Sequence, residues 1–223
     1  MTRHPRIRAE DGVALLLVLM ATAVLAALAG GAVLGVMVES RVAGAWRDGD
    51  AALHAAEAGL AVALDELAAM SDWTPVLDGT ARSSHRDGPA GPRRVPGGRE
   101  IDLLRETNLL RCGRGSCTEA QVRAASADRP WGPANPWWEP FLHAPLRVVV
   151  GRTEAPDVYV AVWVGDDPDE TDGDPRRDGP GAGEGRVVAR ARGWGPSGVA
   201  RTVEVLAART PGGVARLSWS EIR

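Results

Sequence analysis

The sequence predicts an α+β protein in which a long N-terminal helix, with a transmembrane first half, packs on a C-terminal antiparallel β-sheet. Three observations predict this fold. Residues 13–38 carry no charged side chain. A helical stripe of apolar residues continues to about Met70. Runs of alternating apolar and polar residues then recur between Leu146 and Ala208, a pattern typical of half-buried antiparallel strands.

The uncharged segment 13–38 is longer than the roughly 20 apolar residues with which a helix crosses a bilayer core. A buried core helix is the alternative, but such helices rarely run this far without a charge. A cleavable secretory signal is disfavoured because the apolar run continues well past Ala29. Arg3, Arg6 and Arg8 precede the segment, and positive charge at a membrane flank favours the cytoplasm. We therefore expect a single pass with a cytoplasmic N-terminus.

The second half of the predicted helix, residues 39–72, is amphipathic. No proline occurs from Glu39 to Met70, and helix-forming residues dominate. Apolar residues recur at spacings of three, four and seven, which places them on one helix face. They are Val42, Trp46, Leu53, Ala56, Leu60, Leu64 and Leu67. The simplest arrangement is one continuous helix from about Val13 to Met70, with its first half in lipid and its second half on a domain.

The N-terminal residues resemble those of type IV prepilins. Residues 1–12 form a short polar leader with arginines, and the leader ends at Gly12, directly before the apolar helix. The resemblance implies that prepilin peptidase cuts after Gly12, leaving Val13 as the mature, methylated N-terminus. Leu17 occupies the fifth mature position, where major pilins have a glutamate that neutralises the terminal amine of a neighbouring subunit. Leu17 therefore argues against the main filament subunit.

The segment from Arg41 to Leu60 is similar to the PilX-type minor pilins. That family carries an Arg-x-x-Ala-x-x-x-x-Asp motif followed by an Ala-Ala-Glu-Ala-Gly-Leu box. In this chain Arg41, Gly44 and Asp50 stand for the first motif, with glycine in place of its alanine and the aspartate one position late. The box is complete, and it comprises Ala55, Ala56, Glu57, Ala58, Gly59 and Leu60.

The resemblance implies a minor pilin that helps to initiate or modify pilus assembly and acts in adhesion. Its implied partners are other pilins and minor pilins, the assembly platform of the inner membrane and prepilin peptidase. It would begin in the bacterial inner membrane and then join the pilus at the cell surface. Two alternatives stay open: a K-type pseudopilin of type II secretion, and a single-pass membrane scaffold or sensor that is never cleaved.

The region 73–145 is predicted to be rich in loops. Residues 74–100 abound in Pro, Gly, Arg and Ser, and residues 102–110 could hold a short strand or a helical turn. Cys112 and Cys117 are the only cysteines, and an extracytoplasmic location favours a disulfide over a metal pair. An aromatic and proline cluster either caps the core or forms a contact patch. It contains Pro130, Trp131, Pro136, Trp137, Trp138, Pro140 and Phe141.

The C-terminal region, 146–223, is predicted to form a four-stranded antiparallel sheet that lies against the helix. The expected strands are Leu146–Gly151, Val158–Val164, Arg186–Trp194 and Ala200–Ala208. A Gly-Pro-Ser-Gly sequence links the last two as a hairpin turn. The stretch Arg-Ala-Arg-Gly-x-Gly at residues 190–195 is also similar to the C-terminal hairpin of the pilin family.

An acidic loop, 165–179, separates two of the expected strands. Four aspartates alternate with turn residues, and calcium takes 6–8 oxygen ligands from flexible loops of this kind. They are Asp167, Asp169, Asp172 and Asp174. No glutamate follows at the twelfth position of an EF-hand pattern, so a solvated loop with Arg176 and Arg177 as counter-charges is the alternative. The sequence suggests no cofactor other than calcium.

Other functional classes find little support. The net charge of −3 gives no electrostatic case for a nucleic-acid partner, and every basic side chain other than histidine is an arginine. The four histidines stand in no catalytic signature, and the chain has neither a phosphate-binding loop nor an HExxH motif. We therefore expect assembly by helix packing and no enzymatic activity.

Overall fold

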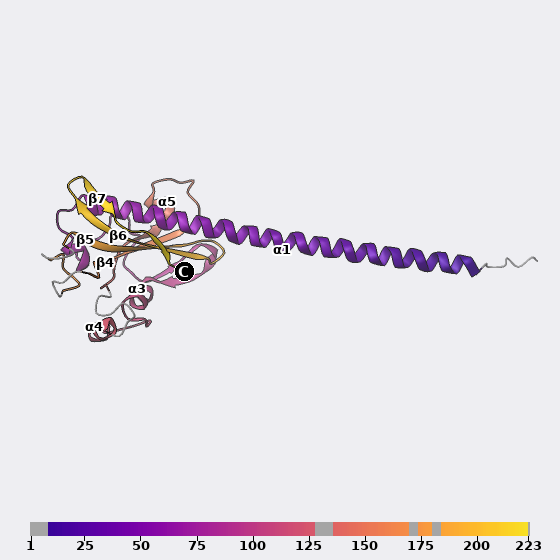
Figure 1. Ribbon diagram of the computed structural model, residues 1–223, viewed down its shortest axis with the longest axis horizontal. Helices are drawn as coiled ribbons and strands as arrows, with labels where there is room; N and C mark the ends of the chain where they lie inside the picture. Colours follow the sequence, from indigo (N-terminus) through magenta and orange to yellow (C-terminus); the bar gives the residue numbers. More distant parts are fainter. Residues whose placement is uncertain (1–8, 128–135, 170–173, 180–183, 223) are drawn as a thin grey trace, which may run out of the picture. The chain divides into compact units, whose positions relative to one another are not determined.

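The structure is a computed structural model, and it describes residues 9–127, 136–169, 174–179 and 184–222. The chain divides into two compact units, Met1–Trp46 and Arg47–Arg223. In the first unit the described residues belong to helix α1, which runs from Ala9 to Ala68 (Figure 1). The continuous helix predicted from the sequence is therefore confirmed, although it begins about one turn before Val13.

The second unit is built on a six-stranded antiparallel sheet with the order β3-β4-β5-β6-β7, in which β8 also pairs with β6. The strands are β3 (Glu139–Pro145), β4 (Tyr159–Asp166), β5 (Arg186–Trp194), β6 (Ala200–Thr210), β7 (Gly213–Arg216) and β8 (Ser220–Ile222). The predicted α+β fold is confirmed, but the expected number of four strands is wrong. Strands β7 and β8 have only 4 and 3 residues, too few for a clear alternation in the sequence.

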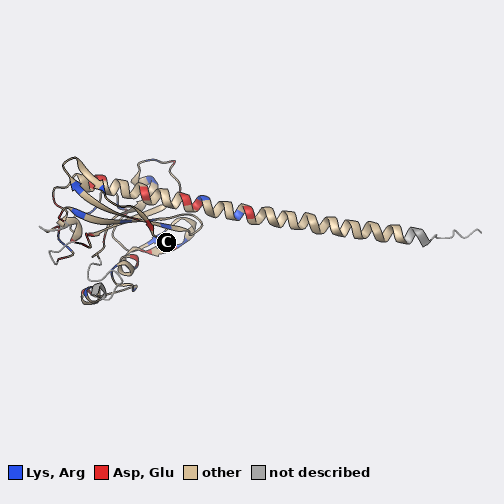
Figure 2. Ribbon diagram, in the orientation of Figure 1, with Lys and Arg blue, Asp and Glu red and all other residues tan. Residues whose placement is uncertain are grey.

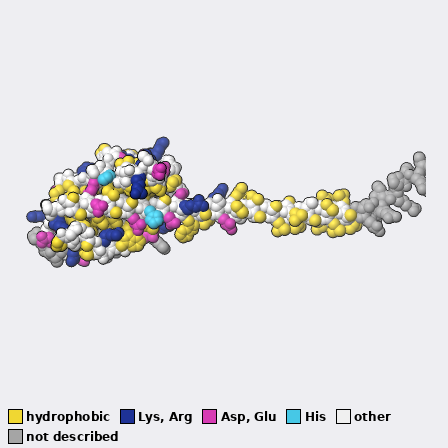
Figure 3. All heavy atoms as spheres, turned by 90° about the horizontal axis from the view of Figure 1, so that it is seen from above, with side chains coloured by type: hydrophobic (Ala, Val, Ile, Leu, Met, Phe, Trp, Pro, Cys, Tyr) yellow, Lys and Arg dark blue, Asp and Glu magenta, His cyan; other side chains and the backbone are white. Residues whose placement is uncertain are grey.

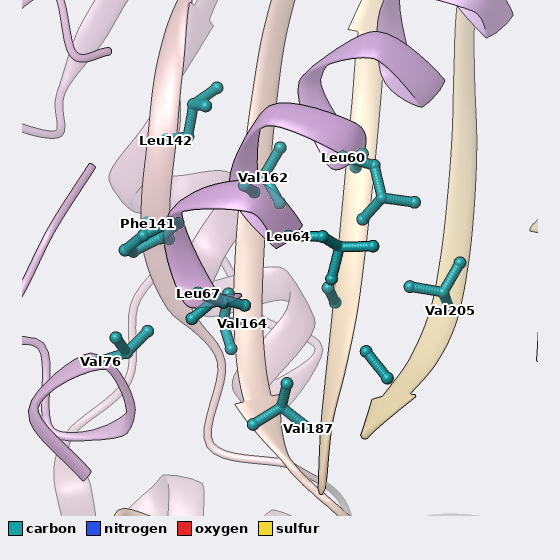
Figure 4. Close-up of a cluster of buried hydrophobic side chains, with 14 of the residues drawn as sticks. Leu60, Leu64, Leu67, Val76, Phe141, Leu142, Val162, Val164, Val187 and Val205 are labelled. Carbon is teal, nitrogen blue, oxygen red and sulfur yellow. The ribbon is translucent and has the colours of Figure 1, made fainter. Parts of the chain in front are cut away.

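One face of the sheet packs on the second half of α1. Leu60, Leu64 and Leu67 project from the helix onto valines of β4, β5 and β6 and onto Phe141 and Leu142 of β3 (Figure 4). The helix ends where the indole nitrogen of Trp73 donates a hydrogen bond of 2.9 Å to the carbonyl of Leu67. This bond satisfies one of the carbonyls that the end of a helix leaves unpaired.

The opposite face of the sheet is covered as well. Its core joins Val95, Ile101, Leu103 and Trp138 to residues of β4 and β5, among them Tyr159, Trp163 and Trp194. All residues of β4 are consequently buried. The prediction of half-buried strands is wrong for β4, because it assumed a single covered face.

The outer layer contains more regular structure than its Pro- and Gly-rich sequence predicted. Residues 74–100, predicted as loop, include α2 (Thr74–Leu77), β1 (Pro92–Arg94) and the 3-10 helix η1 (Pro96–Gly98). Strand β2 (Glu100–Asp102) pairs with β1, and α3 (Leu103–Cys112) and α4 (Glu119–Ala127) follow. Helix α3 begins where the Asp102 carboxylate accepts a bond of 2.9 Å from the amide of Leu104, an N-cap.

The prediction of a first strand at Leu146–Gly151 is wrong. That segment forms the short helix α5 (Leu146–Val149), and the strand β3 precedes it. Strand β3 contains Pro140 and Pro145, and proline has no amide hydrogen to donate to a sheet. Strand β3 lies at the edge of the six-stranded sheet, however, where a missing donor costs little.

Candidate functional site

The first half of α1 is the most unusual surface of the described residues. Its large apolar side chains between Val13 and Val38 are 54% to 66% exposed. The ribbon of this stretch carries no charged-residue colour in Figure 2, and Figure 3 shows hydrophobic side chains along it. The helix is long and apolar enough to cross a membrane, and none of its most apolar stretch is buried. A buried core helix is therefore excluded for this stretch within the first unit.

The processing residues lie at the start of this helix. Gly12 and Val13 are both within α1, and Leu17 is 61% exposed among other apolar side chains. Arg3, Arg6 and Arg8 lie outside the described residues. Cleavage after Gly12 stays a prediction.

The box of residues 55–60 gains a physical explanation from the second half of α1. Ala55, Ala56, Gly59 and Leu60 are buried. Ala56 and Leu60 pack on the sheet, and Ala55 packs on Leu146 of α5 and on Val158. An added Cβ on Gly59 would lie 2.6 Å from Cγ2 of Val160 in β4. Only glycine fits this position without a shift of its neighbour, because real Cβ atoms do not approach other atoms so closely.

The sheet contributes matching glycines from the Arg-Ala-Arg-Gly-Trp-Gly stretch. A Cβ on Gly193 of β5 would lie 2.1 Å from the carbonyl oxygen of Ala52 in α1. A Cβ on Gly195 would lie 3.0 Å from the carbonyl oxygen of Asp48. The small residues of the helix and the glycines of the hairpin are thus two sides of one close helix–sheet contact, which we call the helix seat.

The remaining motif residues lie outside the helix seat. The Glu57 side chain is 41% exposed and lies 3.3 Å from Nδ1 of His54. Arg41 and Asp50 are exposed, and Ala58 is half-buried. A Cβ on Gly44 would meet no described atom within 4 Å. Packing within the chain therefore explains most of the box but neither Glu57 nor the Arg41 motif.

A disulfide joins Cys112 and Cys117, the pairing expected from their spacing. It connects the end of α3 to the segment before α4, and Cys112 packs with Val122 and Trp137. The left-handed conformation of Gly113, with φ of 72°, ends α3 inside the disulfide loop.

The aromatic and proline cluster packs into the core where it is described. Trp137, Trp138 and Phe141 are buried. The guanidinium groups of Arg111 and Arg176 lie 5.2 Å and 5.4 Å from the ring of Trp137, as cation–π contacts. Pro130 and Trp131 lie outside the described residues.

The acidic loop is described only in part, because Asp172 lies outside the described residues. Asp167 is buried, and it accepts a bond of 3.0 Å from the amide of Asp169 and lies 3.8 Å from the Arg186 guanidinium. Asp174 accepts a bond of 3.2 Å from the amide of Arg176. Among the described residues no group of three potential ligands is placed to hold a metal ion. Calcium binding therefore stays a prediction without structural support.

Sequence reasoning missed a polar network centred on His143, which is fully buried in β3. Its Nδ1 lies 3.0 Å from the Asp87 carboxylate, and its Nε2 accepts a bond of 3.0 Å from Nε of Arg86. The same Asp87 oxygen accepts bonds from the Tyr159 hydroxyl at 3.1 Å and from Nε of Arg93 at 2.9 Å. Asp87 and His143 are 56 residues apart in the chain, so no local pattern linked them.

The electrostatics of this network follow from its contacts. Burial lowers the pKa of His143, the bond to Asp87 opposes this shift, and the Arg86 charge lowers the pKa further. Burial would raise the pKa of Asp87, but bonds from Arg93 and His143 hold it below its usual range. Because Arg86 donates to Nε2, the ring is neutral and carries its proton on Nδ1. Both ring nitrogens are bonded to these partners, which points to a structural role.

The geometry thus provides an exposed apolar helix, a helix seat and a polar network around a buried histidine. Comparison with protein-family models, with curated proteins and with solved structures finds no match to this chain.

Proposed function

We propose that this protein is a minor pilin of the PilX type, anchored in the bacterial inner membrane and then incorporated into a type IV pilus. It would help to initiate or modify pilus assembly, and its contribution is helix packing, not catalysis. The observation that carries the proposal is the composition of α1. An uncharged, exposed half that ends at Val38 is followed by a half built of small residues that fit one particular sheet.

The exposed half requires a non-aqueous partner. Covering one Val, Leu or Met side chain is worth roughly 1.5–3 kcal/mol, and the stretch 13–38 exposes many of them. Lipid can cover this surface, and so can other helices of the same kind. A pilin uses both in turn, because its helix leaves the bilayer when the subunit enters the filament.

Leu17 supports a minor position in the filament. A buried terminal amine without a carboxylate partner is costly. A subunit whose fifth mature residue is leucine cannot supply that carboxylate to a neighbour, so we place it where no neighbour requires one. A K-type pseudopilin of type II secretion fits Leu17 equally well and is the second candidate.

The first experiment tests processing. The full chain is expressed with and without prepilin peptidase, together with Gly12→Val and, as a matched control in the same helix, Gly35→Val. We expect the wild type and the control to begin at Val13 and Gly12→Val to keep residues 1–12. An uncleaved wild type would overturn the proposal in favour of a permanent membrane scaffold or sensor.

The second experiment separates the two candidates. Sheared pili are collected from cells that carry a type IV pilus system and probed for the mature chain. Its presence in the pili supports the minor pilin. A mature chain that is absent from pili but recovered with a type II secretion pseudopilus would support the K-type pseudopilin instead.

A further inference from the structure

The apolar stripe of α1 begins with two residues that the described part of the chain leaves uncovered. Leu53, Ala56 and Leu60, further along the stripe, belong to the core between the helix and the sheet or pack against it. Val42 and Trp46, at its start, are instead 51% and 64% exposed. The stripe predicted from the sequence is therefore longer than the part of it that packs on the sheet.

Trp46 is unusual among the tryptophans of the described residues. Five others are at most 8% exposed: Trp73, Trp137, Trp138, Trp163 and Trp194. Trp219 is 47% exposed, but only Trp46 shares a helix with an exposed apolar span. An indole is apolar except for its N–H group, so an exposed tryptophan suits a boundary between an apolar and an aqueous environment. Trp46 comes about two helical turns after Val38, where the uncharged segment ends.

Charged residues return to α1 where the uncharged segment 13–38 ends (Figure 2). Glu39 and Arg41 are the first of them, and Arg47 follows Trp46 directly. Both arginines are exposed. The long stem of an arginine lies along apolar surface while its guanidinium group stays in a polar layer. Residues 39–47 thus combine an apolar pair on one helix face with charged groups that remain hydrated.

The position of Trp46 along α1 fits the headgroup layer of a bilayer. The segment 13–38 is about 39 Å long as a helix, the hydrocarbon core is about 30 Å thick, and a tilt of about 40° matches the two lengths. With this tilt the backbone of Trp46 stands about 9 Å above the core, and the headgroup layer is roughly 5–7 Å deep. Side chains of a helix point toward its N-terminus, here toward the bilayer, so the indole lies closer to the core than the backbone does. The indole of Trp46 and the side chain of Val42, one turn nearer to the core, therefore reach this layer.

A protein partner fits this surface less well than lipid does. A stable protein interface buries about 800 Å² on each partner, whereas a tryptophan side chain offers roughly 150–250 Å². Val42 adds little to this area, and the charged residues Glu39 and Arg41 interrupt its continuity with the apolar span. At a membrane–water boundary one amphipathic ring is sufficient, and tryptophan is enriched there at headgroup level.

We propose that residues 39–47 of α1 bind the surface of a phospholipid bilayer, with Val42 and Trp46 inserted into its headgroup layer. The ring of Trp46 contacts the upper part of the acyl chains, and its N–H donates to a lipid ester carbonyl or to water. Zwitterionic lipid is sufficient, because Glu39 and Asp48 offset the two arginines of this segment. The inference rests on the membrane anchor of the proposed function but not on cleavage or on entry into a pilus.

Fluorine NMR tests the proposal on the full chain, labelled with fluorinated tryptophan and placed in phosphatidylcholine nanodiscs. Trp46→Phe assigns the signal of Trp46 by its absence. The matched control adds Ala61→Trp to Trp46→Phe, which moves the indole to another exposed position of α1, about 22 Å further along the helix. Each protein is measured with a phosphatidylcholine that carries a nitroxide near its glycerol, and separately with a water-soluble gadolinium chelate.

We expect the nitroxide lipid to abolish the signal of Trp46 and to leave the signal of the Ala61→Trp indole, while the chelate broadens the latter more. If Trp46 responds to both agents as the control indole does, it is in water, and the proposal is overturned although the anchor stands. If neither agent changes the Trp46 signal, protein covers the ring, and the proposal is overturned in favour of a protein partner. A wild-type chain that does not co-purify with the nanodiscs would overturn the membrane anchor as well.

Discussion

The two halves of α1 belong to one helix but differ in exposure and in composition. In the first half, apolar side chains occur all round the helix and every described side chain from Val13 to Ala43 is exposed. In the second half, one face is buried and is built of alanine, glycine and leucine. Uniform apolarity suits a solvent such as lipid, whereas small residues on one face suit a single rigid partner. Substitutions at matched positions should therefore have opposite consequences in the two halves.

The largest effect is expected from a charge in the first half. Leu25→Arg should weaken membrane insertion by about 3 kcal/mol, because an arginine side chain must leave water at the centre of the span. Alkaline extraction of membranes measures this as a shift of the protein to the soluble fraction. Ala61→Arg, at an exposed position of the second half, is the control and should stay in the membrane. Equal extraction of both variants would show that residues 13–38 are not the anchor.

A bulky side chain should lower stability in the second half of α1 and have no effect on it in the first half. Gly59→Leu should destabilise the second unit by about 2–3 kcal/mol, because the new side chain overlaps Val160. Gly31→Leu should leave that stability unchanged, since a Cβ there meets no described atom within 4 Å. Denaturation of the full chain in detergent, followed by tryptophan fluorescence, gives both values. A similar loss in the two variants would contradict the assignment of the helix seat.

The smallest effect on stability is expected from Glu66, a charged residue of the second half of α1. Burial would raise the pKa of Glu66, but bonds from Ser83, Ser84 and His85 hold it below its ordinary value of 4.5. Because its pKa is lowered, Glu66 stabilises the fold at pH values above 4.5. This contribution is lost as the pH falls below 4.5 and through the lowered pKa of Glu66. Glu66→Gln should therefore cost about 1 kcal/mol at neutral pH and much less in acid. Glu39→Gln, in the first unit, should have no effect at either pH.

Much of the fold could be predicted because its signals are local. The uncharged span and the helical stripe defined α1, and strict alternation located β4, β5 and β6. Strand β3 could not be recognised, because its prolines are tolerated only at a sheet edge and the edge is set by tertiary structure. The short strands β1 and β2 form where the outer layer packs, which a Pro- and Gly-rich sequence does not reveal.

One of the two sites could also be recognised from the sequence, and the other could not. The box Ala55–Leu60 was found as a motif, but a physical reason for it, the close approach of Gly59 to Val160, required the three-dimensional arrangement. The network of Asp87, His143 and Tyr159 had no signal at all, since its members come from a loop and two strands. His143 lies in the region 73–145 that was predicted to be rich in loops, and it stands in no motif.

The bond between Cys112 and Cys117 makes the chain a reporter of its own topology. Disulfides form and persist in oxidising compartments and are rare in the cytoplasm. Both cysteines follow the apolar span in the sequence, so their state in living cells records the side of the membrane that the second unit reaches. If Cys112 and Cys117 react with an alkylating reagent only after a reductant is added, they are joined as a disulfide in the cell. This result would place Arg47–Arg223 outside the cytoplasm, without any fusion or tag.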